Sequence, residues 1–235
     1  MNLLELLTGD DDDRAARAGK FYGVVVGVVT NNQDPEKLGR VKVKFPWLAD
    51  TDESSWARQA VLMAGGGRGT FFLPEVGDEV LVAFEHGDVR FPFVLGALWN
   101  GVDAPPRDNA DGKNDVRVVH SRGGHELVFN DADGKGRVEI KTKAGHQILL
   151  DDADGSEKIT IKDKSGENSV VLDSSQNSVA VVGKTKVSIK AEQVEIEATS
   201  SLTIKSQQME ISANSSMTVK SSSMLTIQGS TVKIN

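Results

Sequence analysis

The stretch that decides the fold is residues 201–235, "SLTIKSQQMEISANSSMTVKSSSMLTIQGSTVKIN". It is rich in Ser, Thr, Lys and Gln, a composition typical of segments that bury too little apolar surface to fold. Its aliphatic residues nevertheless follow a regular pattern that begins near Lys186. Intervals of 7, 8, 7, 8, 8 and 7 residues separate the members of one aliphatic column: Ile189, Ile196, Ile204, Ile211, Val219, Ile227 and Ile234. This spacing argues against a disordered tail.

A companion column lies two residues ahead of the first and consists of Val187, Val194, Leu202, Met209, Met217, Leu225 and Val232. Residues two apart share one face of a β-strand, so each repeat is one short strand followed by a corner. An α-helix would need a spacing of about 3.6 residues and a coiled coil about 3.5, and the abundant Ser, Thr and β-branched residues disfavour helix. The columns therefore predict β-structured rungs.

One copy of the chain cannot enclose these columns. A β-solenoid formed by a single chain needs about 20 residues per coil, whereas each rung here supplies one side. Three chains that each give one side of a triangular prism would bury every column on the axis and leave no long free edge. We therefore predict an intertwined trimeric β-helix, a stiff needle, over residues 187–235. Its trimer core would be Val187, Ile189, Val194, Ile196, Leu202, Ile204, Met209, Ile211, Met217, Val219, Leu225 and Ile227.

Three successive units of 21 residues precede the needle and begin at Gly124, Gly145 and Gly166. Each unit holds two alternating strands separated by a turn, which reads "DADG" in the first two. This period predicts a β-stalk over residues 124–186, with a neck over 107–123. The Asp-x-Asp-Gly of the turns is shared with calcium loops, but the spaced glutamate and helical flanks of an EF-hand are missing, which favours a plain turn.

His125 and His146 occupy equivalent places in the first two units, and Glu167 takes that place in the third. A threefold axis could gather three copies of either histidine into a metal site. Polar residues at the start of an outward-facing strand are the favoured interpretation. We predict no metal, no cofactor and no catalytic residue.

The first part of the chain has a different construction. All six prolines and three tryptophans lie before residue 107, and no Phe, Trp or Tyr follows Phe129. Short β-like runs separated by Gly, Pro, Asp and Asn predict a small closed antiparallel barrel over residues 20–106. The runs are "FYGVVVGVVT" (21–30), "GRVKVKFPWL" (39–48), "SWARQAVLM" (55–63), "GTFFLPEVGDEVLVAF" (69–84) and "DVRFPFVLGALW" (88–99).

Motifs for chemistry are weak in this part. The glycine run "AGGGRGT" (64–70) lacks the Lys-Ser/Thr of a phosphate loop and predicts a tight turn. Asp78 and Glu79 are expected at a turn and a strand edge rather than as paired catalytic carboxylates. The chain has no cysteine, which excludes thiol catalysis, and its formal charge of −7 argues against nucleic acid as a partner.

The sequence resembles the central spike proteins of contractile injection machines. These are the phage baseplate spikes of the baseplate assembly protein V group and the VgrG proteins of type VI and extracellular systems. The resemblance covers residues 20–235 and is carried by "GVVTNNQDPEKLGRVKVKFPWL" (27–48), residues 54–101, "SRGGHELVFNDADG" (121–134) and the rungs. It implies an all-β protein with an N-terminal OB-fold followed by a trimeric β-helix, which punctures a target envelope when a sheath contracts.

The resemblance also implies partners. The large hub domains of full-length VgrG proteins have no counterpart in this sequence, so we expect a separate hub protein that docks on residues 1–19, through Leu3, Leu4, Leu6 and Leu7. Some spikes bind iron through His-x-His motifs near the C-terminus, but the last histidine here is His146. A PAAR-type tip protein is expected instead on Val232, Ile234 and Asn235, with an effector as cargo and transient contact with the target membrane.

No signal peptide or membrane-spanning stretch is indicated, so the protein is expected to be made in the bacterial cytoplasm and assembled into a phage tail or injection particle. Two other functions stay open. An OB-fold could bind single-stranded nucleic acid or saccharide through aromatics such as Trp47, Trp56 and Phe71. A β-helical polysaccharide hydrolase would need an acidic pair in an aromatic-lined cleft, and the stalk has no such aromatics beyond Phe129.

Overall fold

A computed structural model of the chain describes residues 19–48 and 52–234. The chain divides into two compact units, Met1–Lys184 and Thr185–Asn235. All regular structure in the described ranges is β, apart from one 3-10 turn at Glu85–Gly87. Within these ranges, no helix has the length and apolar content that crossing a bilayer requires.

Five strands of the first unit form a barrel-like sheet in the order β2-β1-β6-β7-β3. Their bounds are β1 Val24–Asn31, β2 Lys42–Lys44, β3 Arg58–Gln59, β6 Glu79–Phe84 and β7 Pro92–Ala97. The sheet closes where Val41, just before β2, bridges Ala57, just before β3. The Val41 N–H donates to the Ala57 carbonyl at 3.1 Å, and the Ala57 N–H donates back at 2.7 Å.

The barrel core comes from the alternation that the sequence predicts. Val41, Val43 and Phe45 are buried, while Lys42 and Lys44 between them are half-exposed. The same alternation buries every second residue of β6, and the inward side chains of the strands pack together as one cluster. This core consists of Val29, Val41, Val43, Phe45, Ala57, Val80, Val82, Phe84 and Val94.

The expectation of a wholly antiparallel barrel is wrong in one place, because β3 and β7 run parallel. The reason is parity: in a closed ring of five strands, directions cannot alternate all the way round, so one neighbouring pair must be parallel. The run 55–63 also yields only the two-residue strand β3. The glycine run forms a small separate hairpin of β4 Ala64–Gly65 and β5 Arg68–Gly69, which is the tight turn that the sequence predicts.

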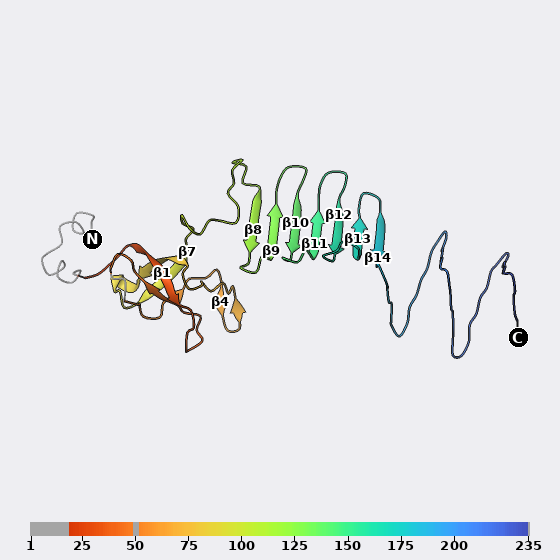
Figure 1. The fold of residues 1–235 in the computed structure, drawn as a ribbon, viewed down its shortest axis with the longest axis horizontal. Coiled ribbons are helices and arrows are strands. Elements are labelled where there is room, and N and C mark those ends of the chain that lie inside the picture. The colour runs from red at the N-terminus through yellow and green to blue at the C-terminus, as the bar shows by residue number, and fades with distance from the viewer. Residues whose placement is uncertain (1–18, 49–51, 235) are drawn as a thin grey trace. The chain divides into compact units, whose positions relative to one another are not determined.

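Seven strands beyond the barrel form a second sheet in which each strand pairs with the next along the chain, all antiparallel. Figure 1 shows them as successive arrows, side by side. The later six come as one pair per 21-residue unit, whereas β8 lies inside the range predicted as a neck. The strands are β8 Val116–His120, β9 Glu126–Asn130, β10 Arg137–Lys141, β11 Gln147–Asp151, β12 Lys158–Lys162, β13 Ser169–Asp173 and β14 Ser178–Val182.

The second unit, Thr185–Asn235, is built differently. In its described residues, 185–234, no segment pairs with another segment as a β-strand. Figure 1 accordingly draws no arrow beyond β14. The backbone amides and carbonyls of this unit are therefore left without the ladder partners that a strand normally has.

Candidate functional site

Two apolar columns run across one face of the seven-stranded sheet. Directly opposed residues of an antiparallel pair lie on the same face, so the pairing register defines each column. The first column crosses β9 to β14 as Phe129, Val138, Leu150, Ile159, Leu172 and Val179, and its position on β8 is Arg117. The second is Val119, Leu127, Ile140, Ile148, Ile161, Val170 and Val181. We call these two columns the stalk columns.

The stalk columns are poorly covered in the single chain. Most of their side chains are exposed, from 38% for Ile159 to 70% for Val179. A contiguous apolar face of this kind is rare on monomeric soluble proteins and marks a surface that another molecule covers. Sequence reasoning did not include these residues in the trimer core.

The opposite face of the sheet is mixed: its middle column includes Val118, Val128, Leu149 and Val171, and its two flanking columns carry charged side chains in complementary pairs. Asp151 lies opposite Arg137 on one side and Lys158 on the other, and Lys158 lies opposite Asp173. Cross-strand pairs of opposite charge stabilise a sheet by a few tenths of a kcal/mol each. These charged pairs make this face the more polar of the two, so the apolar face is the side that needs a partner.

The turns at one edge of the sheet repeat with the 21-residue period. The side-chain oxygens of Ser121 and Thr142 accept the backbone N–H groups of His125 and His146, at 3.0 and 3.1 Å. Both histidines are exposed and directly precede a strand. The ring of His125 also accepts the Lys143 N–H at 3.3 Å, which ties this turn to the next one.

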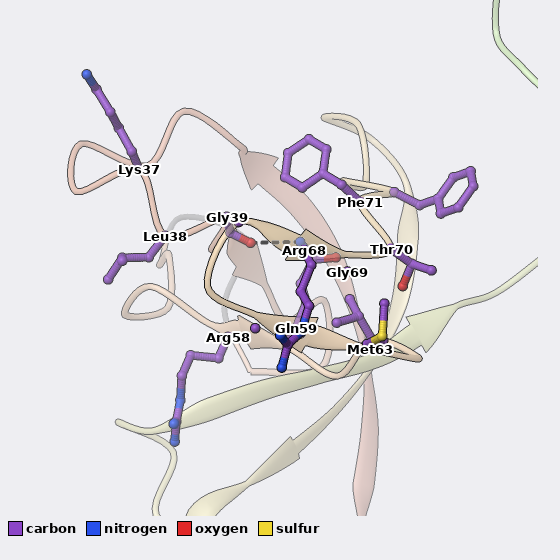
Figure 2. A pocket seen from close by; sticks show the side chains of 15 residues that line it. Lys37, Leu38, Gly39, Arg58, Gln59, Met63, Arg68, Gly69, Thr70 and Phe71 are labelled. Carbon is purple, nitrogen blue, oxygen red and sulfur yellow. Dashed lines mark hydrogen bonds between the residues drawn. The ribbon is translucent and has the colours of Figure 1, made fainter.

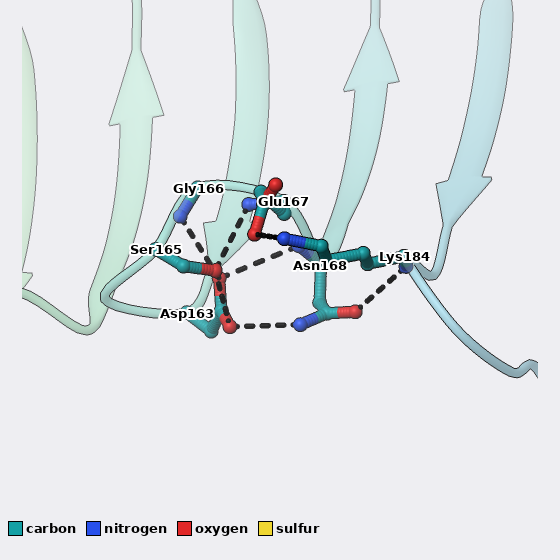
Figure 3. Close-up of polar contacts among 6 residues, drawn as sticks. All are labelled: Asp163, Ser165, Gly166, Glu167, Asn168 and Lys184. Atoms are coloured by element: carbon teal, nitrogen blue, oxygen red, sulfur yellow. Dashed lines mark hydrogen bonds and ion pairs between the residues drawn. The ribbon is translucent and has the colours of Figure 1, made fainter.

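The third turn of this edge is one residue longer and has Asp163 in the equivalent place (Figure 3). The Asp163 carboxylate accepts hydrogen bonds from Asn168 Nδ2 and Ser165 Oγ at 2.8 Å, and from the Gly166 N–H at 2.9 Å. These donors, led by the Asn168 side chain, lower the pKa of Asp163 to about 2. Asn168, the extra residue, also accepts the Lys184 N–H at 3.0 Å.

The "DADG" segments at the other edge are ordinary turns, as predicted. Asn130 Oδ1 accepts the Ala132 N–H at 3.0 Å, and Asp151 Oδ1 accepts the Ala153 N–H at 3.2 Å. These side chains are occupied in closing the turn. Across the ranges that the structure describes, no group of three or more His, Asp or Glu side chains is placed to hold a metal ion.

The predicted trimer-core residues all lie exposed in the second unit. The trimer-core members of the Val187 column are between 51 and 59% exposed, and those of the Ile189 column are between 64 and 73% exposed. These ranges are narrow, so the rungs from Val187 to Ile227 present their side chains in the same way. The single chain brings none of these residues into a buried cluster among its described residues.

The docking residues predicted at the two ends of the chain are only partly described. Val232 and Ile234 are exposed, Ile234 almost fully at 90%. Asn235 at one end, and Leu3, Leu4, Leu6 and Leu7 at the other, lie outside the described residues.

An open cavity of about 660 Å³ lies on the barrel, next to the β4–β5 hairpin (Figure 2). Lys37, Arg58, Arg68 and Phe71 are among its lining residues, and Gln59 Nε2 donates to the Gly39 carbonyl at 2.8 Å.

The aromatics proposed for ligand stacking have separate environments. Trp47 packs against Phe21, with ring centroids 4.8 Å apart, and Trp56 lies beneath Arg40 and Lys42.

A small OB-like barrel joined to a repetitive antiparallel sheet defines an all-β protein with a stalk. Residues 25–99 match the family described as the type VI secretion system/phage-baseplate injector OB domain. Residues 25–99 are therefore similar to the OB domain of the phage baseplate V and VgrG spike family.

Three of the similar proteins are named as spike proteins of type VI secretion systems. VgrG3 of Vibrio cholerae serotype O1 is 30% identical over 128 residues, which is 51% of this chain and 13% of that protein. VgrG4b of Pseudomonas aeruginosa is 31% identical over 131 residues, or 47% of this chain and 16% of that protein. VgrG1a of the same organism is 30% identical over 132 residues, or 52% of this chain and 20% of that protein. The chain thus spans a fifth or less of the length of these relatives.

Proposed function

We propose that this chain forms the homotrimeric central spike of a contractile tail or injection-system baseplate. Three copies pack their stalk columns against one another, and the two columns that begin at Val187 and Ile189, the needle columns, line the core of the needle. The spike punctures the target envelope when the machine fires. It acts mechanically and has no enzymatic activity of its own.

The observation that carries this proposal is the exposed apolar face of the stalk. The other face of the same sheet is more polar and carries pairs of opposite charge, so the apolar face is the one available for association. The second unit supports the same conclusion, because its described residues have no ladder within the chain. Strands from other copies would supply the missing backbone hydrogen bonds, and burial of each aliphatic side chain would contribute about 1.5–3 kcal/mol.

The trimer explains how such a molecule could carry force. A continuous ladder of backbone hydrogen bonds and a dry, close-packed axis resist compression along the needle. The outer face of mixed charge, exemplified by Arg137 beside Asp151, stays hydrated during passage. A needle without Phe, Trp or Tyr would adhere little to membrane interfaces, where Trp and Tyr are enriched.

The partners belong to the same proposal. A hub protein binds residues 1–19 through Leu3, Leu4, Leu6 and Leu7, and a PAAR-type tip protein covers Val232, Ile234 and Asn235. The exposure of Val232 and Ile234 supports the second contact. An effector would travel with the tip, and the spike would be made in the cytoplasm before assembly.

Sedimentation equilibrium of the full chain tests the assembly, with a trimer as the expected result. A well-folded monomer whose isoleucines are hidden from water would overturn the proposal. A chain truncated after Ile211 tests the role of the needle. The truncated chain should lose tip docking and injection, while its tryptophan fluorescence should still show a folded barrel. Unchanged injection by particles that carry the truncated chain would refute the mechanical role.

The barrel cavity favours a second candidate, a binding module for an anionic ligand. Lys37, Arg58 and Arg68 line it, and Phe71 offers an exposed ring. Retardation of a single-stranded oligonucleotide that weakens with salt and is lost in an Arg58→Ala, Arg68→Ala variant would support this function. Absence of binding at low salt would exclude it for nucleic acid.

A further inference from the structure

The turns of the stalk sheet form two rows. Because the seven strands are antiparallel and each pairs with the next, successive turns lie at alternate ends of the strands (Figure 1). The first turn row consists of residues 121–125, 142–146 and 163–168, and the second turn row consists of residues 131–136, 152–157 and 174–177. A strand of five residues, about 17 Å long, separates the two rows within one copy.

The first turn row carries an exposed cation at the second place of each turn: Arg122, Lys143 and Lys164. Its two carboxylates already have partners. Asp163 accepts hydrogen bonds within its own turn, and Glu167 pairs with Lys184 (Figure 3). In the part of the chain that the structure describes, Lys143 and Lys164 form no ion pair. This row therefore presents unneutralised positive charge.

The second turn row has the opposite character. It carries one lysine, Lys135, and five carboxylates, which are Asp131, Asp133, Asp152, Asp154 and Glu157. Asp131 pairs with Arg117 of β8. Among the described residues, no cation pairs with Asp133, Asp152 or Asp154, all of which are exposed. Because the strands hold the two rows apart, the charges of one copy cannot neutralise each other.

The symmetry of the proposed trimer brings unlike rows together. When the stalk columns of three copies face a common axis and run along it, each rotation carries a first turn row onto a first turn row. At every corner, the first turn row of one copy then meets the second turn row of the next. Both rows repeat once per two strand spacings, about 10 Å, so the contact recurs along the stalk.

A packing in which the copies run in opposite directions would have the reverse effect. A twofold axis across the columns places first row against first row and second row against second row, so that like charges face each other. Like charges at an interface disfavour the wrong arrangement, and complementary charges fix the orientation of the right one. The charge difference between the rows therefore favours parallel copies.

We propose that the first turn row of each copy forms ion pairs with the second turn row of the next copy, and that these contacts align the three copies in parallel. Lys143 and Lys164 supply the cations, and Asp133 and Asp152 are the carboxylates placed to receive them. The inference rests on the proposed trimer. It adds which surfaces of neighbouring copies meet and why the copies point the same way.

Reversal of charge on each row tests the contact. One variant carries Lys143→Glu with Lys164→Glu, a second carries Asp133→Lys with Asp152→Lys, and a third combines all four changes. We expect each of the first two variants to lower the temperature at which the trimer dissociates by several degrees. The third variant should recover most of that loss, because it only exchanges the charges of the two rows.

The recovery is specific to contact between copies. Within one copy the rows are about 17 Å apart, which is about two Debye lengths at physiological salt, so the two sets of changes should act additively in a single chain. In about 1 M salt, where the Debye length is about 3 Å, the losses of the first two variants should shrink.

A matched control keeps the net charge of the third variant. It combines Asp133→Lys and Asp152→Lys with Lys190→Glu and Lys220→Glu, which change two exposed lysines of the second unit. This control should not recover the loss. Equal recovery in the control and in the third variant would overturn the inference, because net charge alone would then explain the result.

Sedimentation of the unchanged chain separates this inference from the proposed function. A trimer in which the two losses add in the third variant, or in which neither reversal has an effect, removes the contact between turn rows and leaves the trimeric spike standing. A folded monomer removes both.

Discussion

At the scale of single residues, one carboxylate organises the loop between β1 and β2. Asp34 accepts the N–H groups of Glu36 and Leu38 at 3.0 and 2.9 Å, and binds the Arg40 guanidinium through Nε and Nη2 at 2.9 and 2.8 Å. The bond to the Arg40 side chain is the main reason that the pKa of Asp34 lies well below its usual range. The Arg40 guanidinium also lies over the Trp56 ring.

The pH dependence of this contact has a definite sign. Because the pKa of Asp34 is lower in the folded protein, its contribution to stability is present above about pH 4, the usual carboxyl pKa, and is lost as the pH falls. We predict that Asp34→Asn lowers the unfolding temperature by several degrees at pH 7, and that its difference from the unchanged protein shrinks below about pH 4.

Tryptophan fluorescence measures this change in the barrel alone, since Trp47, Trp56 and Trp99 all lie there or at its end. Asp103→Asn is the control, because it removes an exposed carboxylate outside the barrel strands. A difference between Asp34→Asn and the unchanged protein that is the same at pH 7 and pH 3 would contradict the account.

At the scale of elements, the β4–β5 hairpin depends on one glycine. Gly69 has a φ of +145°, and a Cβ atom there would lie 2.3 Å from the Met63 carbonyl oxygen, which accepts the Thr70 N–H. We predict that Gly69→Ala opens the hairpin, seen as faster amide exchange and proteolysis over residues 63–70. Gly66→Ala is the matched control, because nothing lies within 4 Å of its added Cβ. Equal protection in the two variants would show that the clash is relieved without opening.

At the scale of the whole molecule, substitution by Asn should affect the trimer at one residue of β12 and leave it unchanged at the neighbouring residue. Ile161 belongs to the stalk columns and Thr160 to the charged face. In a monomer Ile161→Asn would be nearly neutral, because the side chain is 46% exposed. In the proposed trimer each unpaired amide on the axis costs roughly 1–3 kcal/mol beyond the lost burial. We predict that Ile161→Asn dissociates or strongly destabilises the trimer.

Sedimentation equilibrium and the temperature at which the trimer dissociates measure this effect. Thr160→Asn, which keeps a polar side chain on the outer face, should sediment as the unchanged protein does. Equal behaviour of the two variants would mean that the stalk columns are not the surface that associates.

The sequence was sufficient to predict the features that depend on local periodicity. Alternation in "RVKVKF" indicates which residues of β2 face the core, because side chains change face at each residue of any strand. The 21-residue period places two strands in each stalk unit, and the needle columns recur every seven or eight residues because each rung repeats the previous one.

Only the tertiary structure revealed the stalk columns and the parallel pair β3–β7. Antiparallel pairing reverses direction at each strand, so a column recurs at unequal intervals: 9 residues from Phe129 to Val138, then 12 from Val138 to Leu150. These two intervals add up to the 21-residue period, which relates alternate strands but does not show which residues of neighbouring strands are opposed. Strand register and closure of the barrel depend on contacts between segments that are distant along the chain. Those contacts exist only once the strands are paired.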